Sequence, residues 1–237
     1  MAKQKTIKLY GKHAALAALA NPRRVVHQLY ATKDMMQQHD LASTNVPYTV
    51  ADSKQLARQL SADAIHQGII LDAAPLASCH IDEMAQTGKA ILLLDQLTDP
   101  HNVGAIMRSA AAFNVGGIIM HDRSAPKESG VMARAASGAL DMVPFAYVSN
   151  IAQAMDTLKE SGYWCIGLDG QAYDALQEFA LPDKVALVLG AEGKGLRELT
   201  IKRCDGLVKL SMHPQMESLN VSNAAAIALH TLYTRSG

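Results

Sequence analysis

Six short, continuously apolar runs divide the chain from residue 90 onward. Strands covered by helices on both faces have such runs, whereas half-exposed strands alternate between apolar and polar residues. Segments with helical character separate the runs, and this alternation is typical of a parallel sheet. The pattern therefore predicts an α/β domain over residues 90–237. The runs are AILLLD, GGIIMH, MVPFAYV, YWCIGLD, KVALVLG and GLVKLS.

The sequence pattern of residues 1–74 predicts a smaller α/β module. Three segments rich in branched and aromatic residues are expected strands: VVHQLYAT (25–32), VPYTVA (46–51) and QGIILDAA (67–74). Residues 75–89 have mixed polarity and weak periodicity, so we expect a linker there. The predicted domains are thus 1–74 and 90–237.

Charge is distributed unevenly although the whole chain has zero net charge. Residues 1–72 contain nine Lys and Arg against five Asp and Glu, whereas residues 73–237 contain 13 against 17. A basic module joined to an acidic one indicates that the front faces a polyanion, with a simply solvated surface as the alternative. The basic residues that are candidates for this contact are Lys8, Lys12, His13, Arg23 and Arg24.

Cysteine usage indicates the compartment. Cys79, Cys165 and Cys204 lie far apart without C-x-x-C spacing, so neither a disulfide framework nor a metal site is predicted. The reducing cytoplasm fits best. No apolar stretch approaches membrane-spanning length, and we expect no membrane partner.

Three loops follow the expected strands at the sheet edge where ligands bind in such folds. The first leads into a helix that is thin because of Gly104 and several alanines, and it carries Asn102 and Arg108. A solvated helix arginine is the alternative interpretation of Arg108. The second loop, LGAEGKGL, leaves backbone groups open through its three glycines, and it matches neither a Walker A loop nor G-x-G-x-x-G.

The third loop runs through SMHPQMESLNVSN into the last helix. It is long and irregular, which favours a functional role over a simple connection. Ser and Asn are also the preferred helix caps, and we expect Ser222 or Asn223 to cap the last helix. Ser218 and Asn220, just upstream, are then the candidates for function.

The three loops, in the order N-x-G-x-x-x-R, G-A-E-G-x-G-L and S-L-N-V-S, resemble the motifs of the SpoU, or TrmH-like, RNA ribose methyltransferases of the SPOUT class. YGKHAALAAL near the start is similar to the front module of the bacterial members that act on a guanosine of 23S ribosomal RNA. The resemblance implies a trefoil-knot domain with a parallel sheet, and an L30e-like front domain that binds RNA. It also implies S-adenosylmethionine as cofactor, a homodimer with active sites at its interface, and a 2′-O-methylated ribose as product.

Site residues follow from the resemblance position by position. The implied catalytic residues are Asn102, Arg108, Glu192, Ser218 and Asn220. The implied cofactor contacts, chiefly through backbone atoms, are Gly190, Gly193, Gly195, Leu210, Met212 and Leu219. The sequence departs from the family pattern at Ser211 and at His213-Pro214-Gln215, which affects the expected wall of the cofactor pocket.

Several alternatives stay open from the sequence. Arg108 is either the general base or a clamp on an RNA phosphate, and the RNA is either ribosomal or transfer RNA. A catalytically silent RNA-binding or ribosome-assembly protein on the same fold is an alternative of another class. A dinucleotide-dependent oxidoreductase is less favoured because the loop after the first strand of the larger domain lacks the glycine fingerprint.

Overall fold

The protein was analysed as a computed structural model that describes residues 5–191, 193, 195–213 and 215–235. The chain divides into two compact units. The front unit contains residues 1–77 and also residues 127–142, and the main unit contains residues 78–126 and 143–237. A segment from the middle of the chain therefore belongs to the front unit, a feature that the sequence did not indicate.

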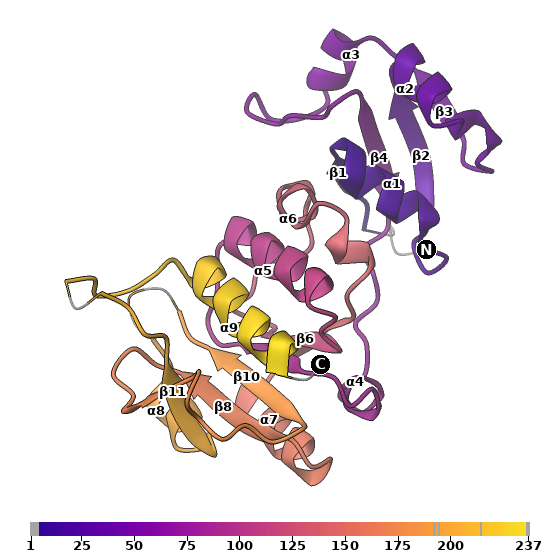
Figure 1. Cartoon of the computed structure of the whole chain (residues 1–237). Coiled ribbons are helices and arrows are strands. Elements are labelled where there is room, and N and C mark those ends of the chain that lie inside the picture. Colours follow the sequence, from indigo (N-terminus) through magenta and orange to yellow (C-terminus); the bar gives the residue numbers. More distant parts are fainter. Residues whose placement is uncertain (1–4, 192, 194, 214, 236–237) are drawn as a thin grey trace. The chain divides into compact units, whose positions relative to one another are not determined.

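The front unit has a four-stranded sheet of order β1-β4-β2-β3 (Figure 1). Strand β4 is antiparallel to β1 and β2, whereas β2 and β3 are parallel. The three predicted strands are present, and β1 is an addition. The elements are β1 (Ile7–Tyr10), α1 (Lys12–Ala20), β2 (Val26–Ala31), α2 (Lys33–Gln38), β3 (Tyr48–Val50), α3 (Ser53–Ala57), β4 (Ile69–Ala73) and α6 (Gly130–Ala136), with 3-10 turns at Leu41–Ser43 and Ala139–Asp141.

Two glycines let the inserted segment approach the rest of the front unit closely. A Cβ atom at Gly130 would lie 2.3 Å from the Tyr10 ring and 2.4 Å from the Lys8 carbonyl oxygen. Gly138 has φ 94°, and its Cβ would lie 3.0 Å from the side chain of Ala17. Neither position tolerates a larger residue without displacement of its neighbours.

A buried ion-pair network holds the same segment. Arg24 donates from Nε to Asp141 Oδ1 at 2.8 Å and from Nη2 to Asp141 Oδ2 at 3.0 Å, and it also pairs with Glu128. Burial by itself lowers the pKa of Arg24, but the two carboxylates outweigh burial and the pKa is raised. Burial raises the pKa of Glu128, which the charge of Arg24 only partly offsets. Because each charge has a partner in a dry site, the loss of one would be costly for the others.

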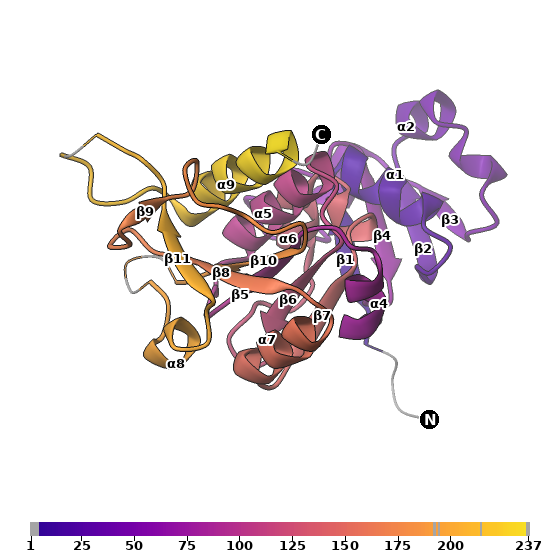
Figure 2. The same cartoon turned by 60° about the horizontal axis from the view of Figure 1, so that its bottom comes forward.

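The main unit is built on a seven-stranded sheet of order β7-β6-β5-β10-β8-β11-β9, in which every recorded pairing is parallel. Helices α5 and α9 cover one face, and α7 and α8 cover the other (Figure 2). All six apolar runs form strands, and β9 is an addition. The elements are α4 (Ile81–Gln86), β5 (Ile91–Leu94), α5 (Pro100–Ala112), β6 (Gly117–His121), β7 (Phe145–Val148), α7 (Ile151–Glu160), β8 (Trp164–Leu168), β9 (Asp174–Ala175), β10 (Val185–Leu189), α8 (Glu198–Ile201), β11 (Gly206–Lys209) and α9 (Val221–Arg235).

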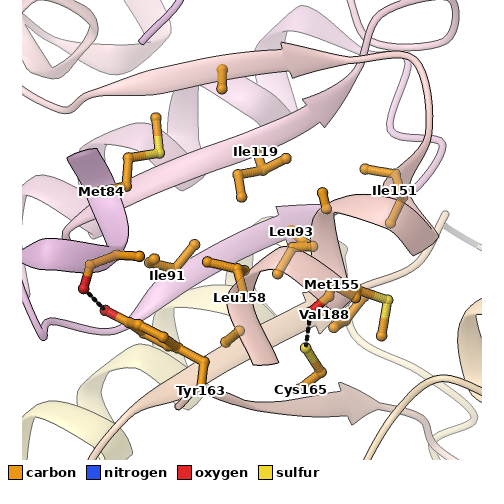
Figure 3. Close-up of a cluster of buried hydrophobic side chains, with 14 of the residues drawn as sticks. Met84, Ile91, Leu93, Ile119, Ile151, Met155, Leu158, Tyr163, Cys165 and Val188 are labelled. Atoms are coloured by element: carbon orange, nitrogen blue, oxygen red, sulfur yellow. Dashed lines mark hydrogen bonds between the residues drawn. The ribbon is translucent and has the colours of Figure 1, made fainter. Parts of the chain in front are cut away.

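Alternate residues of these strands pack against α7 in a continuous apolar core (Figure 3). Tyr163 lies in this core, and its hydroxyl donates to the carbonyl of Lys89 at 2.9 Å. Burial raises the pKa of the Cys165 thiol to about 12 and that of Cys204 to about 11. Both thiols are therefore protonated and unreactive near neutral pH.

Helices α5 and α9 lie side by side on the opposite face of the sheet (Figures 1 and 2). Both helices carry small buried residues, including Gly104 and Ala110 of α5 and Ala225 and Ala228 of α9, which allow this close packing. The prediction of a thin, closely approached helix is confirmed. This packing fixes the start of α9 against the start of α5, where the candidate site residues lie.

Candidate active site

The first two loops leave neighbouring strands at the carboxyl edge of the sheet. Leu94, the last residue of β5, pairs with Leu189, the last residue of β10. The loop into α5 and the second loop, LGAEGKGL (189–196), which we call the glycine loop, therefore begin side by side. The third loop begins after β11, which is separated from β10 by β8.

The first and third loops meet through two asparagines. Asn220 donates from its side-chain nitrogen to Asn102 Oδ1 at 3.1 Å. Asn220 Oδ1 also accepts from the backbone N–H of Ser222 at 2.9 Å, and α9 begins at Val221. Asn220 is therefore the helix cap, and the expectation that Ser222 or Asn223 caps α9 was wrong. One side chain both starts the helix and reaches the first motif.

The glycine loop closes on itself. The backbones of Ala191 and Gly195 exchange hydrogen bonds of 3.1 and 2.9 Å. A Cβ atom at Gly190 would lie 2.2 Å from the carbonyl carbon of Gly195, so only glycine fits there. Gly193 and Gly195 have φ values of 77° and 65°, and a Cβ on either would meet nothing within 4 Å. Glu192, predicted to be catalytic, lies outside the described residues.

The structure also places the other predicted cofactor contacts. Leu210 is buried at the end of β11, whereas Met212 and Leu219 are half-buried in the third loop. These residues offer apolar side chains, and the glycine loop offers open backbone groups. This combination fits a ligand with both apolar and polar parts, such as S-adenosylmethionine.

The remaining third-loop positions are exposed. Ser218 is exposed, and so are Ser211, His213 and Gln215, where the sequence departs from the family pattern. Pro214 lies outside the described residues. The described departures therefore concern side chains at the surface of the loop and not buried packing.

Arg108 is exposed on α5 and stands apart from the two asparagines. It lies six residues beyond Asn102, which corresponds to about 9 Å along the helix and about 120° around it. Among the charged side chains that the structure describes, none forms an ion pair with Arg108. Within one chain, Arg108 and the Asn102–Asn220 pair face different directions.

Three residues beside the glycine loop were missed by the sequence analysis. Asp95 directly follows β5 and is 1% exposed. Its Oδ2 accepts from Arg197 Nε at 3.0 Å and from Thr200 Oγ1 at 2.6 Å, and its Oδ1 lies 2.7 Å from Arg197 Nη2. A charged residue ending the apolar run AILLLD was the available signal, since a buried carboxylate requires partners.

The candidate RNA contacts in the front unit separate into two groups. The prediction that Arg24 contacts RNA was wrong, because its side chain is 0% exposed and its guanidinium pairs with two carboxylates. Lys8 is partly exposed and pairs with Asp72 at 2.7 Å. Lys12 is half-buried, and His13 and Arg23 are exposed, so these three side chains still reach the surface.

A large cavity of the main unit lies away from these loops. Its volume is about 1070 Å³. Its lining includes Lys89, Asn114 and Val185, which lie at or just before the beginnings of strands, and Tyr233 near the end of α9. It therefore opens at the sheet edge opposite to the three loops.

Neither a metal-binding cluster nor a membrane-spanning helix occurs among the residues that the structure describes. The described residues contain no group of three or more His, Cys, Asp or Glu side chains arranged to hold a metal ion. No helix within the described ranges is long and apolar enough to span a membrane.

Two family models match the chain and together cover most of it. Residues 89–230 match the SpoU rRNA Methylase family, and residues 8–78 match the RNA 2′-O ribose methyltransferase substrate-binding domain. The chain belongs to the SpoU rRNA methylase family. The membership confirms the family predicted from the three motifs, and with it the class of activity, S-adenosylmethionine-dependent 2′-O-methylation of RNA.

Individual relatives agree with this membership. The 23S rRNA (guanosine-2′-O-)-methyltransferase RlmB of Vibrio parahaemolyticus is 39% identical over 93% of this chain and 94% of its own length. An uncharacterized tRNA/rRNA methyltransferase of Synechocystis is 34% identical over 97% of this chain, which spans 62% of that protein.

The fold has solved counterparts. The SpoU methyltransferase AviRb of Streptomyces viridochromogenes, solved in complex with AdoMet, superimposes with a TM-score of 0.84. It is 20% identical, and the match covers 97% of this chain and 90% of that one. The predicted fold class, a SPOUT domain with a parallel sheet together with a small N-terminal domain, is confirmed.

Proposed function

We propose that this SpoU protein methylates the ribose 2′-hydroxyl of a guanosine in 23S ribosomal RNA. The contact between Asn102 and Asn220 carries the proposal, because it joins the first and third motifs at the sheet edge that also bears the glycine loop. Relatives that match nearly the full length of the chain are named for this reaction.

The cofactor would bind to the glycine loop and the third loop. S-adenosylmethionine supplies a methyl group on a cationic sulfonium. The open backbone at Gly193 and Gly195 would form hydrogen bonds with the polar groups of the cofactor. Leu210, Met212 and Leu219 would pack against its apolar parts. Gly190 serves a different purpose, since it lets the two limbs of the loop touch.

The polar side chains would bind and orient the substrate. Asn102 and Asn220 hold each other in place, and exposed Ser218 lies two residues before Asn220. We assign Ser218 and Asn220 to positioning of the target ribose. We retain Glu192 as a further polar group of the site from its place in the second motif. Alignment of a nucleophile with an electrophilic carbon accounts for much of the rate of such displacements.

Arg108 would act as a clamp on an RNA phosphate. An arginine with a solution pKa above about 12 is a poor proton acceptor near neutrality, whereas its forked donors match a phosphate. Arg108→Lys keeps the charge but loses the fork, and we expect a large loss of turnover with unchanged cofactor affinity. Turnover close to the wild type with an unchanged pH profile would rule out both the base and the clamp.

A homodimer would complete the site. Arg108 lies about 120° around α5 from Asn102, so it is suited to serve the site of a second copy. Helix α9 also exposes Ile227 and Tyr233, which are 43% and 53% exposed. Sedimentation analysis would show a dimer, and mixing Arg108→Ala with Asn220→Ala chains would restore part of the activity in heterodimers.

The front unit would hold the RNA. It contains eleven Lys and Arg against seven Asp and Glu. Arg24, Glu128 and Asp141 are buried together, so the other charged residues have a net charge of +5. A positive surface of this kind favours the RNA backbone. We propose Lys8, Lys12, His13 and Arg23 as contacts and the cytoplasm, where the three free cysteines stay reduced, as the compartment.

The decisive experiment supplies labelled S-adenosylmethionine and unmodified RNA to the purified protein. We expect label in 23S ribosomal RNA, at a guanosine that mass spectrometry identifies as 2′-O-methylated. Label in transfer RNA alone would change the substrate to transfer RNA, which the Synechocystis relative's name also includes. No label in either RNA, from protein that binds both RNA and cofactor, would favour a catalytically silent RNA-binding protein.

A further inference from the structure

The glycine loop is held from outside the three motifs, by Asp95. This carboxylate is buried, and its Oδ2 accepts from Arg197 and Thr200 in the segment that follows the loop, whereas its Oδ1 lies within ion-pair distance of Arg197 without hydrogen-bond geometry. Arg197 lies two residues after Gly195, where the loop closes on Ala191. The segment after the loop is therefore tied to the end of β5 by an ion pair with one charge-assisted hydrogen bond and by a hydroxyl.

Asp95 also sets the direction of the first motif loop. Its backbone N–H donates to the carbonyl of Leu189 at 2.8 Å, which extends the β5–β10 ladder by one bond. The next residue, Gln96, has φ 64°, a left-handed conformation that is uncommon for a residue other than glycine. Such backbone persists where the surrounding structure holds it, and the residue before Gln96, Asp95, is held through both its backbone and its side chain.

We propose that Asp95 is a positioning residue for methyl transfer, acting through Arg197 and Thr200 to keep the cofactor loop at a fixed place relative to Asn102. The inference rests on the proposed assignment of the cofactor to the glycine loop. The side chain of Arg197 is 40% exposed, whereas that of Asp95 is buried. We therefore take Asp95 as the fixed partner that holds Arg197 and the segment after the loop. Asp95 touches neither reactant in this proposal.

The test compares two buried aspartates. Asp95→Asn keeps the shape but removes the charge beside Arg197, and Asp141→Asn does the same beside Arg24 in the front unit. Both variants should lower the melting temperature. We expect only Asp95→Asn to weaken binding of S-adenosylmethionine, by about tenfold or more at a temperature where the protein is folded, because small displacements of binding groups have effects of this order.

Calorimetric titration of the cofactor without RNA, and a separate RNA-binding titration, give the readouts. Weaker cofactor binding with unchanged RNA affinity supports the proposal. Cofactor affinity within threefold of the wild type, together with a lowered melting temperature in both variants, overturns it and leaves a purely structural contact. If the wild type itself does not bind the cofactor, the proposed cofactor loop is wrong, which is a different result.

Two milder variants cover the case in which Asp95→Asn does not fold. Arg197→Lys keeps the charge but loses the Nε donor to Asp95, and Thr200→Val keeps the shape but removes the hydroxyl that donates at 2.6 Å. Weakened cofactor binding in both, relative to the matched Asp141→Asn protein, supports the positioning role. Unchanged binding in both overturns it.

Discussion

Each unit of the molecule contains one buried carboxylate network with an arginine, and the two networks differ in how the arginine is placed. In the front unit, Arg24 is 0% exposed at its side chain and has two carboxylate partners. In the main unit, Asp95 is buried but its partner Arg197 is 40% exposed. Both networks join segments distant in sequence, but the first is closed to solvent, whereas the second lies beside the loop that we propose binds the cofactor. We therefore expect the closed network to act mainly on stability and the half-open one to act on the proposed site.

The largest effect is expected from breaking the closed network. Arg24→Gln leaves Glu128 and Asp141 buried without a cation, which costs about 3–5 kcal/mol of unfolding free energy. Denaturant unfolding would measure the loss. A cost below about 1 kcal/mol would contradict the view that this network holds residues 127–142 in the front unit.

A smaller effect is expected from the close approach of the inserted segment. Gly130→Ala introduces a Cβ at 2.4 Å from the Lys8 carbonyl oxygen, and the displacement of its neighbours costs about 1–3 kcal/mol. Gly170→Ala is the matched control, because a Cβ at that exposed position meets nothing within 4 Å. Equal stability of both variants in thermal unfolding would show that α6 does not need this contact.

The cap of α9 separates stability from activity at the site. Asn220→Ala removes both the cap and the contact to Asn102, and we expect a loss of about 1 kcal/mol together with most of the activity. Asn220→Asp keeps an acceptor for the N–H of Ser222 but has no donor for Asn102. It should restore the melting temperature without restoring methyl transfer. If Asn220→Asp recovers both the melting temperature and methyl transfer, the hydrogen bond between Asn220 and Asn102 is not needed for activity.

The smallest effect is expected from an exposed pair of the main unit. Arg203 and Asp156 form an ion pair whose side chains are 46% and 47% exposed. Arg203→Gln should change the unfolding free energy by less than about 1 kcal/mol, because water screens such pairs. A loss as large as that of Arg24→Gln would show that burial does not distinguish the networks of this protein.

Periodicity predicted the main sheet well because its strands are covered on both faces. All six apolar runs are strands, but β9 was missed because it has only two residues, Asp174 and Ala175. Strand β1 was missed because IKLY lies between lysines and a helix-like run of alanines. Neither strand has enough consecutive apolar residues to produce a signal by itself.

The site was predicted from motifs, and its supports were not. The meeting of Asn102 and Asn220 agrees with the expected convergence of the first and third motifs. Asp95 and Arg197 are 102 positions apart, and no local pattern joins them. The same reason explains Arg24, which resembles any surface arginine until the fold brings Asp141 to it. Long-range pairing of charges depends on topology, which composition and spacing do not record.

The insertion of residues 127–142 in the front unit has a consequence for synthesis of the protein. Chains emerge from the ribosome with the amino terminus first, and domains fold as their residues become available. The partners of Arg24 follow it by 104 and 117 positions. The front unit therefore stays incomplete, with Arg24 unpaired, until more than half of the chain has been translated. At that point β7 to β11 of the main unit have not yet been synthesised.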